Sequence, residues 1–125
     1  MNKDVVIVTN NPLVLKEMEH RHSIIYKETT FDGILEQIRD LIHKGYRLLT
    51  HPLSGSVKPG ETPYKSVLMS RGERLDMTSL TLIEDAIRTG RKFEDKSEKY
   101  SGKTLDDLKL IDMDLLKGAI ASAYI

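Results

Sequence analysis

The chain has 125 residues and equal numbers of basic and acidic side chains, 19 Lys and Arg against 19 Asp and Glu, so no overall field attracts nucleic acid or an anionic membrane. Cysteine is absent, which excludes disulfides, thiol redox chemistry and zinc sites of the cysteine type. The first apolar run is too short for a signal peptide or a membrane span, so we expect a cytoplasmic globular protein.

The first half of the chain predicts alternating strands and helices. Residues 5–8 are a continuous β-branched run, which is typical of a central strand buried on both faces. Asn11 can cap a helix that begins at Pro12, and a second short strand is expected at residues 23–26. The clearest helix covers residues 31–42, where apolar side chains recur at the three-and-four spacing of one face.

A long polar segment separates two further apolar runs. Thr29 or Thr30 starts the preceding helix and Gly45 ends it, and a third strand is expected at residues 46–50. A fourth strand is expected at residues 66–70, with no helical pattern in between. We therefore predict that the fourth strand is antiparallel to the third.

The remainder of the chain predicts helices. An apolar stripe covers residues 77–87, and a polar linker follows at residues 94–103. Thr104 resembles the start of a short helix, and Asp112 can cap a last segment at residues 113–125.

These elements predict a small three-layer α/β sandwich with C-terminal helices. The sheet is expected to be four-stranded and mostly parallel, in the order second, first, third, fourth, with the last strand antiparallel. We divide the chain into an α/β domain at residues 1–95 and a C-terminal helical extension at residues 96–125, which packs on the same domain or on an oligomer partner such as the second subunit of a homodimer.

Polar residues gather where the first and third strands end, and in open α/β sheets ligands bind beyond the carboxyl ends of strands. The loop after the first strand offers amide side chains and a helix N-terminus, which favours an anion. The loop after the third strand offers a Ser-Gly-Ser nest and lysines. The candidate ligand-binding residues are Asn10, Asn11, His51, Ser54, Gly55, Ser56, Lys58 and Lys65. A structural reading also stands, in which Asn11 only caps a helix and the serines only form a turn.

Catalytic residues are not identified by any motif. His51 is the candidate acid or base if the protein is an enzyme, because the ordinary pKa of histidine lies near neutrality. A serine nucleophile lacks the Gly-x-Ser-x-Gly elbow, and His20, His22 and His43 lack the spacing of metal ligands. We therefore expect no metal and no cofactor.

Three stretches of sequence resemble the small GrdX family, whose members are encoded beside the glycine, sarcosine and betaine reductase machinery of anaerobic bacteria. They are TNNPLV at residues 9–14, RDLIHKGYRLLTHPLSGSVKP at residues 39–59 and ETPYKSVL at residues 61–68. The resemblance extends to about Phe93. It implies a setting in amino-acid fermentation but no activity and no catalytic residues.

Two classes of function follow. The first, which we prefer, is a noncatalytic accessory or regulatory protein that binds a small anionic metabolite or a glycine reductase component. The second is a small enzyme that acts on a phosphorylated or carboxylated metabolite, with His51 as acid or base and Lys58 or Lys65 as the charge that holds the substrate. Neither class requires nucleic acid or a membrane as partner.

Overall fold

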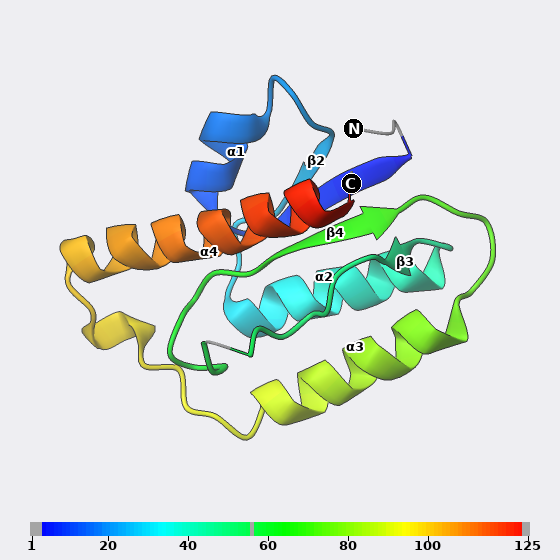
Figure 1. Cartoon of the computed structure of the whole chain (residues 1–125). Coiled ribbons are helices and arrows are strands. Elements are labelled where there is room, and N and C mark those ends of the chain that lie inside the picture. Colours follow the sequence, from blue (N-terminus) through cyan, green and yellow to red (C-terminus); the bar gives the residue numbers. More distant parts are fainter. Residues whose placement is uncertain (1–3, 56, 124–125) are drawn as a thin grey trace.

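The structure, a computed structural model, describes residues 4–55 and 57–123 (Figure 1). Strands and helices alternate along the first half of the chain, and helices dominate the second half. In chain order the elements are β1 Val5–Thr9, α1 Pro12–Met18, β2 Ile24–Tyr26, α2 Phe31–His43, β3 Arg47–Leu48, β4 Ser66–Ser70, α3 Met77–Gly90, the 3₁₀ turn η1 Ser97–Lys99 and α4 Gly102–Ala123.

Side-chain caps set the start of three helices. The side chain of Asn11 accepts a hydrogen bond from the backbone N–H of Leu13, and Pro12 is the first residue of α1, as predicted. Thr30 caps α2 in the same way, and Asp76 caps α3. These caps satisfy backbone N–H groups that have no partner within the helix.

The sheet has the strand order β2-β1-β4-β3, which corrects the predicted order. β1 pairs in parallel with β2, but β1 and β4 are antiparallel, as are β3 and β4. The sheet is therefore mixed rather than mostly parallel. The antiparallel arrangement of the third and fourth strands is confirmed, and so is the interior position of β1, where Val6 and Val8 are fully buried.

Burial explains why β4 and not β3 lies beside β1. Val67, Leu68 and Met69 are buried on both faces of the sheet, which requires strands on both sides and cover above and below. β3 is short, and its Arg47 side chain is exposed, which suits an edge strand. Arg47 was the sequence signal that distinguishes the two strands.

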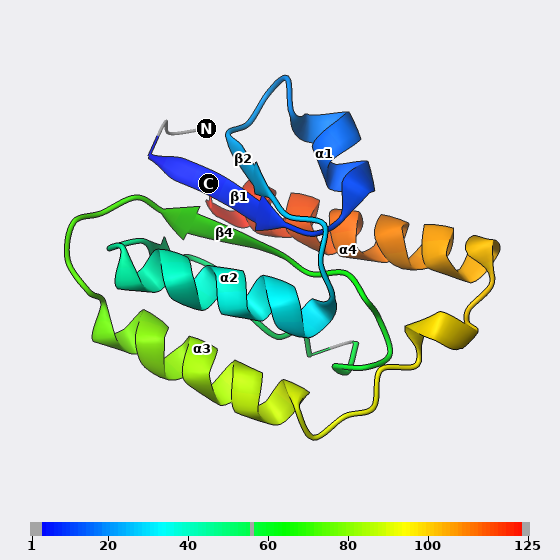
Figure 2. The ribbon, with the colours of Figure 1, turned by 180° about the vertical axis from the view of Figure 1, so that it is seen from behind.

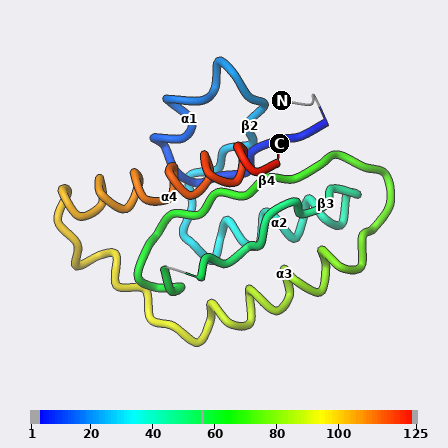
Figure 3. The backbone as a smooth tube through the Cα atoms, viewed as in Figure 1, coloured from blue at the N-terminus to red at the C-terminus, as the bar shows by residue number. Residues whose placement is uncertain are grey.

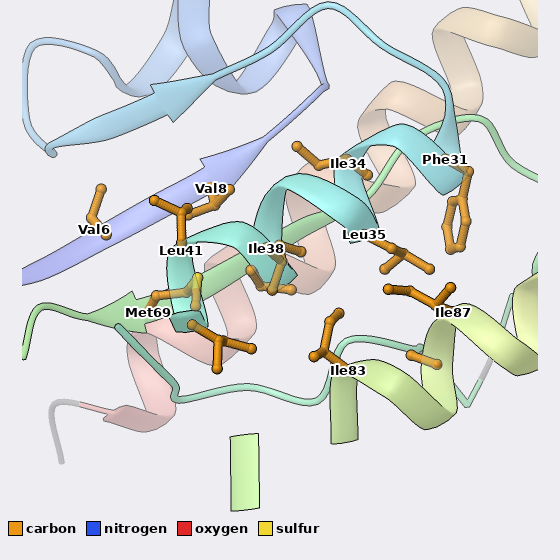
Figure 4. Close-up of a cluster of buried hydrophobic side chains, with 13 residues drawn as sticks. Val6, Val8, Phe31, Ile34, Leu35, Ile38, Leu41, Met69, Ile83 and Ile87 are labelled. Carbon is orange, nitrogen blue, oxygen red and sulfur yellow. The ribbon is translucent and has the colours of Figure 1, made fainter. Parts of the chain in front are cut away.

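Helices cover both faces of the sheet (Figures 1 and 2). On one face, side chains of α2 and α3 pack with Val6, Val8 and Met69 in a single cluster, drawn in Figure 4. On the other face, α1 and α4 pack against Ile7 and Leu68. The alternation of neighbouring residues between the two clusters follows from the two-residue period of a strand.

The C-terminal segment is one continuous helix. α4 begins at Gly102, where Ser101 Oγ accepts a hydrogen bond from the Thr104 N–H at 3.2 Å, so Thr104 does not start a separate short helix. Asp112 lies in the middle of α4 and does not cap a last segment, which corrects that prediction. The helix packs on β4 and α1 of the same chain. The division of the chain at residue 95 stays a prediction.

Residues 49–55 and 57–65 lie between α4 and α3 in the view of Figure 3. They are tied to the connection between these two helices. The backbone N–H of Lys96 donates to the carbonyl of Gly60 at 3.0 Å, and the Tyr100 hydroxyl donates to the carbonyl of Glu61 at 2.9 Å. These bonds hold the loop against the body of the protein.

Candidate functional site

The side chain of Asn10 holds the end of the loop at the carboxyl end of β1. Asn10 Oδ1 accepts a hydrogen bond from the Lys65 N–H at 2.8 Å. Asn10 Nδ2 donates to the carbonyls of Pro63 at 2.7 Å and Thr29 at 2.9 Å. Both polar atoms of this buried amide are therefore used inside the protein, which indicates a structural role for Asn10.

Asn11 is also committed to internal hydrogen bonds. Its Oδ1 caps α1, and its Nδ2 donates to the carbonyl of Lys109 at 2.9 Å and to Asp112 Oδ2 at 3.0 Å. The side chain is fully buried. Asn11 thus joins the start of α1 to the middle of α4.

Asp112 is the buried centre of a polar network at this end of the sheet. Its Oδ1 accepts from the Ser66 N–H at 3.1 Å, and its Oδ2 accepts from the Ser66 hydroxyl at 2.6 Å as well as from Asn11. Thr9 Oγ1 lies 2.6 Å from Ser66 Oγ and accepts from the Asn11 N–H. Since Ser66 Oγ gives its proton to Asp112, Thr9 is the donor to Ser66. The hydrogen bonds form a chain in which each group donates to the next, from the Asn11 N–H through the hydroxyls of Thr9 and Ser66 to the Asp112 carboxylate. Such a chain polarises and strengthens each of its hydrogen bonds.

The sequence prediction missed Asp112 as a residue of the site. Asp112 is four positions before Leu116 and therefore lies on the same helix face. Leu116 is buried, as is Met113. An acidic side chain on the apolar face of a helix was the signal that could have identified it, because such a group is rarely buried without partners.

A cleft with a cavity volume of about 210 Å³ opens between the start of the loop and α4. We call it the loop cleft. It combines hydroxyl, imidazole and charged groups with an apolar wall from α4. Its lining residues are Thr50, His51, Leu53, Ser54, Lys65, Ser66, Asp112, Leu115, Leu116 and Ala119.

A smaller hollow adjoins the loop cleft. Its cavity volume is about 20 Å³, close to the size of one water molecule. Ser54, Lys65, Asp112 and Leu115 line both spaces, so these residues stand at the boundary between them. The remaining residues of the small hollow are Phe31, Val57, Thr62, Tyr64, Leu108 and Ile111.

Lys65 has the most unusual electrostatic environment in this region. Its side chain is half-buried, and burial lowers the pKa of its ammonium group from the ordinary value, while the carboxylate of Asp112 opposes part of that shift. Within residues 4–55 and 57–123, no hydrogen bond or salt bridge involves Lys65 Nζ.

Only some of the other candidate residues of the loop line the cleft. His51 and Ser54 line the loop cleft, and His51 Nδ1 accepts from the Leu53 N–H at 3.0 Å, although the imidazole remains exposed. Gly55 and Lys58 are exposed and line neither the cleft nor the hollow. Ser56 lies outside the described residues.

The loop after β1 and the polar segment before β4 were predicted to form one pocket. They meet instead through a hydrogen bond between Asn10 and the backbone of Lys65. Lys65 contributes its backbone to the Asn10 amide and its side chain to the loop cleft. The asparagine side chains are used inside the protein, and His51, Ser54 and Lys65 line the loop cleft. That any of the candidate residues binds a ligand stays a prediction.

The described part of the chain contains no group of three or more His, Cys, Asp or Glu side chains that could hold a metal ion. Among its helices, none is both long and apolar enough to cross a membrane.

Comparison with known proteins identifies a family. Residues 6–121 match the family described as GrdX-like protein, which confirms the resemblance seen in the sequence. The match continues through most of α4, beyond the region near Phe93 where the resemblance was expected to end. No curated protein and no solved structure matches the chain.

Proposed function

Because the chain belongs to the GrdX-like protein family, we propose that it is an accessory or regulatory protein of glycine reductase-type amino-acid fermentation that binds a small anionic metabolite in the loop cleft. The observation that carries this proposal is the amine of Lys65, which lines the cleft and has no hydrogen-bonding or ion-pairing partner among the described residues. Partial burial of Lys65 disfavours the charged form of its amine, and an anionic ligand beside Nζ would offset that cost.

Neighbouring groups support the binding of a carboxylate or a phosphate. Thr50 Oγ1 accepts a hydrogen bond from the Leu68 N–H at 3.1 Å, which leaves its own hydroxyl proton for a ligand. His51 lies at the exposed rim of the same cleft. The Asp112 carboxylate would repel an anion, but three hydrogen bonds to it spread its charge and the Lys65 ammonium opposes it.

A glycine reductase component is the second partner that this proposal includes. Leu110, Ile111 and Leu115 on α4 are large apolar side chains with exposed fractions of 43–48%. Ile111 and Leu115 also line the two spaces around Lys65. A ligand in the loop cleft would therefore lie beside side chains of the same helix face that a protein partner would cover.

Ligand titration followed by thermal unfolding tests the binding proposal. We expect phosphate, acetyl phosphate or a small carboxylate to raise the melting temperature, because a ligand that binds only the folded state stabilises it. Lys65→Ala should weaken binding about ten- to a hundredfold, since a hydrogen bond to a charged group contributes roughly 1.5–3 kcal/mol.

Lys44→Ala is the matched control for charge, because Lys44 is exposed and lines neither the cleft nor the hollow. It should change the affinity little. If Lys44→Ala weakens binding as much as Lys65→Ala, the effect comes from the net charge of the protein and not from the loop cleft. If none of these anions raises the melting temperature, the binding proposal is wrong.

A small enzyme with His51 as acid or base is the alternative function. It is favoured by one observation, the backbone hydrogen bond from Leu53 that orients the imidazole at the rim of the cleft. Loss of a general acid or base lowers turnover by about a hundredfold or more. Turnover of an acyl phosphate or an amino-acid derivative that disappears in His51→Ala would establish the enzyme and overturn the noncatalytic proposal.

A further inference from the structure

We propose that Lys65 Nζ forms a reversible imine with the carbonyl carbon of a small 2-oxo acid held in the loop cleft. This inference rests on the proposed function and names the class of metabolite that the cleft binds. In the proposed function Lys65 only attracts an anion, whereas here it also forms a covalent bond with the ligand.

The position of the amine is the first argument. Lys65 lines both the loop cleft and the adjoining hollow, so it stands where the two spaces meet. No described group holds Nζ by a hydrogen bond or a salt bridge. A bound carbonyl group can therefore approach the nitrogen without displacing a protein partner.

The protonation state of the amine is the second argument. Burial lowers the pKa of the Lys65 ammonium group, so a larger fraction of this amine is neutral near physiological pH than for an exposed lysine. Only the neutral amine has the lone pair that attacks a carbonyl carbon. The other loop lysine, Lys58, is exposed to water.

The reaction balances without any further reactant. The nitrogen lone pair forms a bond to the carbonyl carbon while the π electrons move to oxygen, and a proton passes from nitrogen to that oxygen to give a carbinolamine. The hydroxyl group then takes up a proton from water in the open cleft and leaves as water, and the carbon–nitrogen double bond forms. The product is a protonated imine, whose positive charge is stabilised by the nearby Asp112 carboxylate.

The lining of the cleft favours a 2-oxo acid over a neutral aldehyde. The Asp112 carboxylate repels a ligand carboxylate, whereas the Thr50 hydroxyl and the His51 imidazole, which also line the cleft, can donate hydrogen bonds to it. Leu115 and Ala119 offer an apolar surface for a short alkyl group. A cavity volume of about 210 Å³ limits the ligand to a small molecule.

Reductive trapping tests the imine. We would incubate the folded protein with pyruvate and cyanoborohydride, measure the intact mass and map the modified peptide. We expect one carboxyethyl group on Lys65, formed several times faster than on any other lysine. The rate at Lys65 should reach half its maximum at a lower pH than the rate at exposed lysines.

Variants at two lysines supply the control. Lys65→Arg keeps the positive charge but lacks a nucleophilic amine, so it should lose the fast adduct, whereas Lys44→Arg, at an exposed lysine outside the cleft, should retain it. The wild-type mapping needs no variant, so the test remains decisive if Lys65→Arg fails to fold. Modification spread evenly over the surface lysines would overturn the inference.

Lactate separates this inference from the proposed function, because it resembles pyruvate in size and charge but has no carbonyl carbon at that position. If lactate and pyruvate raise the melting temperature equally and no fast adduct forms, the imine is wrong and anion binding stands. If pyruvate forms the adduct and stabilises the protein more than lactate, both proposals are supported. If neither compound stabilises the protein and no fast adduct forms, the imine is wrong and binding of small carboxylates fails with it.

Discussion

At the scale of single residues, the most consequential side chain is an acid in an apolar helix face. Asp112 has an exposed fraction of 8%, and its two oxygen atoms accept hydrogen bonds from Ser66 and Asn11. These bonds join α4 to the start of β4 and to the start of α1. Hydrogen bonds to a charged acceptor are stronger than bonds between neutral groups, which makes Asp112 the main polar connection between α4 and the sheet.

Substitution of Asp112 by alanine should lower the free energy of unfolding by about 2–4 kcal/mol, because it leaves the donors of Ser66 and Asn11 buried without an acceptor. Urea denaturation measures this. Asp114→Ala is the matched control, because Asp114 is an exposed acid on the same helix, and its effect should stay within about 0.5 kcal/mol. Equal effects of the two substitutions would contradict the role assigned to the network.

At the scale of elements, two glycines show how the same residue has opposite consequences in different places. Gly45 ends α2 with a φ of +105°, and a Cβ atom there would lie 2.5 Å from the carbonyl oxygen of Gly72. The connection from α2 to β3 and the connection from β4 to α3 thus approach each other through backbone atoms. Gly118 lies inside α4, and a Cβ atom there would meet nothing within 4 Å.

Gly45→Ala should therefore lower the free energy of unfolding by about 1–2 kcal/mol through the backbone conformation alone, and further through the contact with Gly72. Gly118→Ala should raise it by about 0.5–1 kcal/mol, because alanine is the better residue in a helix interior. Thermal and urea unfolding of the two variants provide the comparison. A stabilised Gly45→Ala protein would show that the two connections do not approach as described.

At the scale of the whole molecule, α4 completes the core. Its buried residues Met113 and Leu116 pack in one cluster with Ile7 and Leu68, which are fully buried side chains of the two central strands. Without α4, one face of the sheet would lack most of its cover. The helix is therefore part of the hydrophobic core of this chain.

Leu116→Ala should lower the free energy of unfolding by about 2–5 kcal/mol, because it creates a cavity in that cluster. Leu110→Ala, on the exposed side of the same helix, should change it by no more than about 0.5 kcal/mol. The two variants differ by the same atoms, so their difference in urea denaturation reports burial alone. A similar cost for both would indicate that Leu110 is covered in solution, which light scattering would then detect as a dimer.

The sequence by itself determined the features that depend on neighbouring residues. The β-branched run of β1, the apolar stripe of α2 and the cap at Asn11 were predicted correctly, because each rests on a local pattern. For the start of α2 the sequence left Thr29 and Thr30 open, and the structure shows that Thr30 is the cap. A binding site was also predicted in the polar segment before β4. The structure places His51, Ser54 and Lys65 around one cleft, and the binding of a ligand there stays a prediction.

Only the tertiary structure decided the features that depend on contacts between distant parts of the chain. The insertion of β4 between β1 and β3 depends on pairing between distant segments. The exposed Arg47 suits β3 to an edge, but only the packed sheet shows which strand lies beside β1. The use of Asn10 and Asn11 inside the protein depends on Lys65 and Asp112, which are far away in sequence. The pKa shift of Lys65 arises from burial, a property of the packed molecule that no local pattern records.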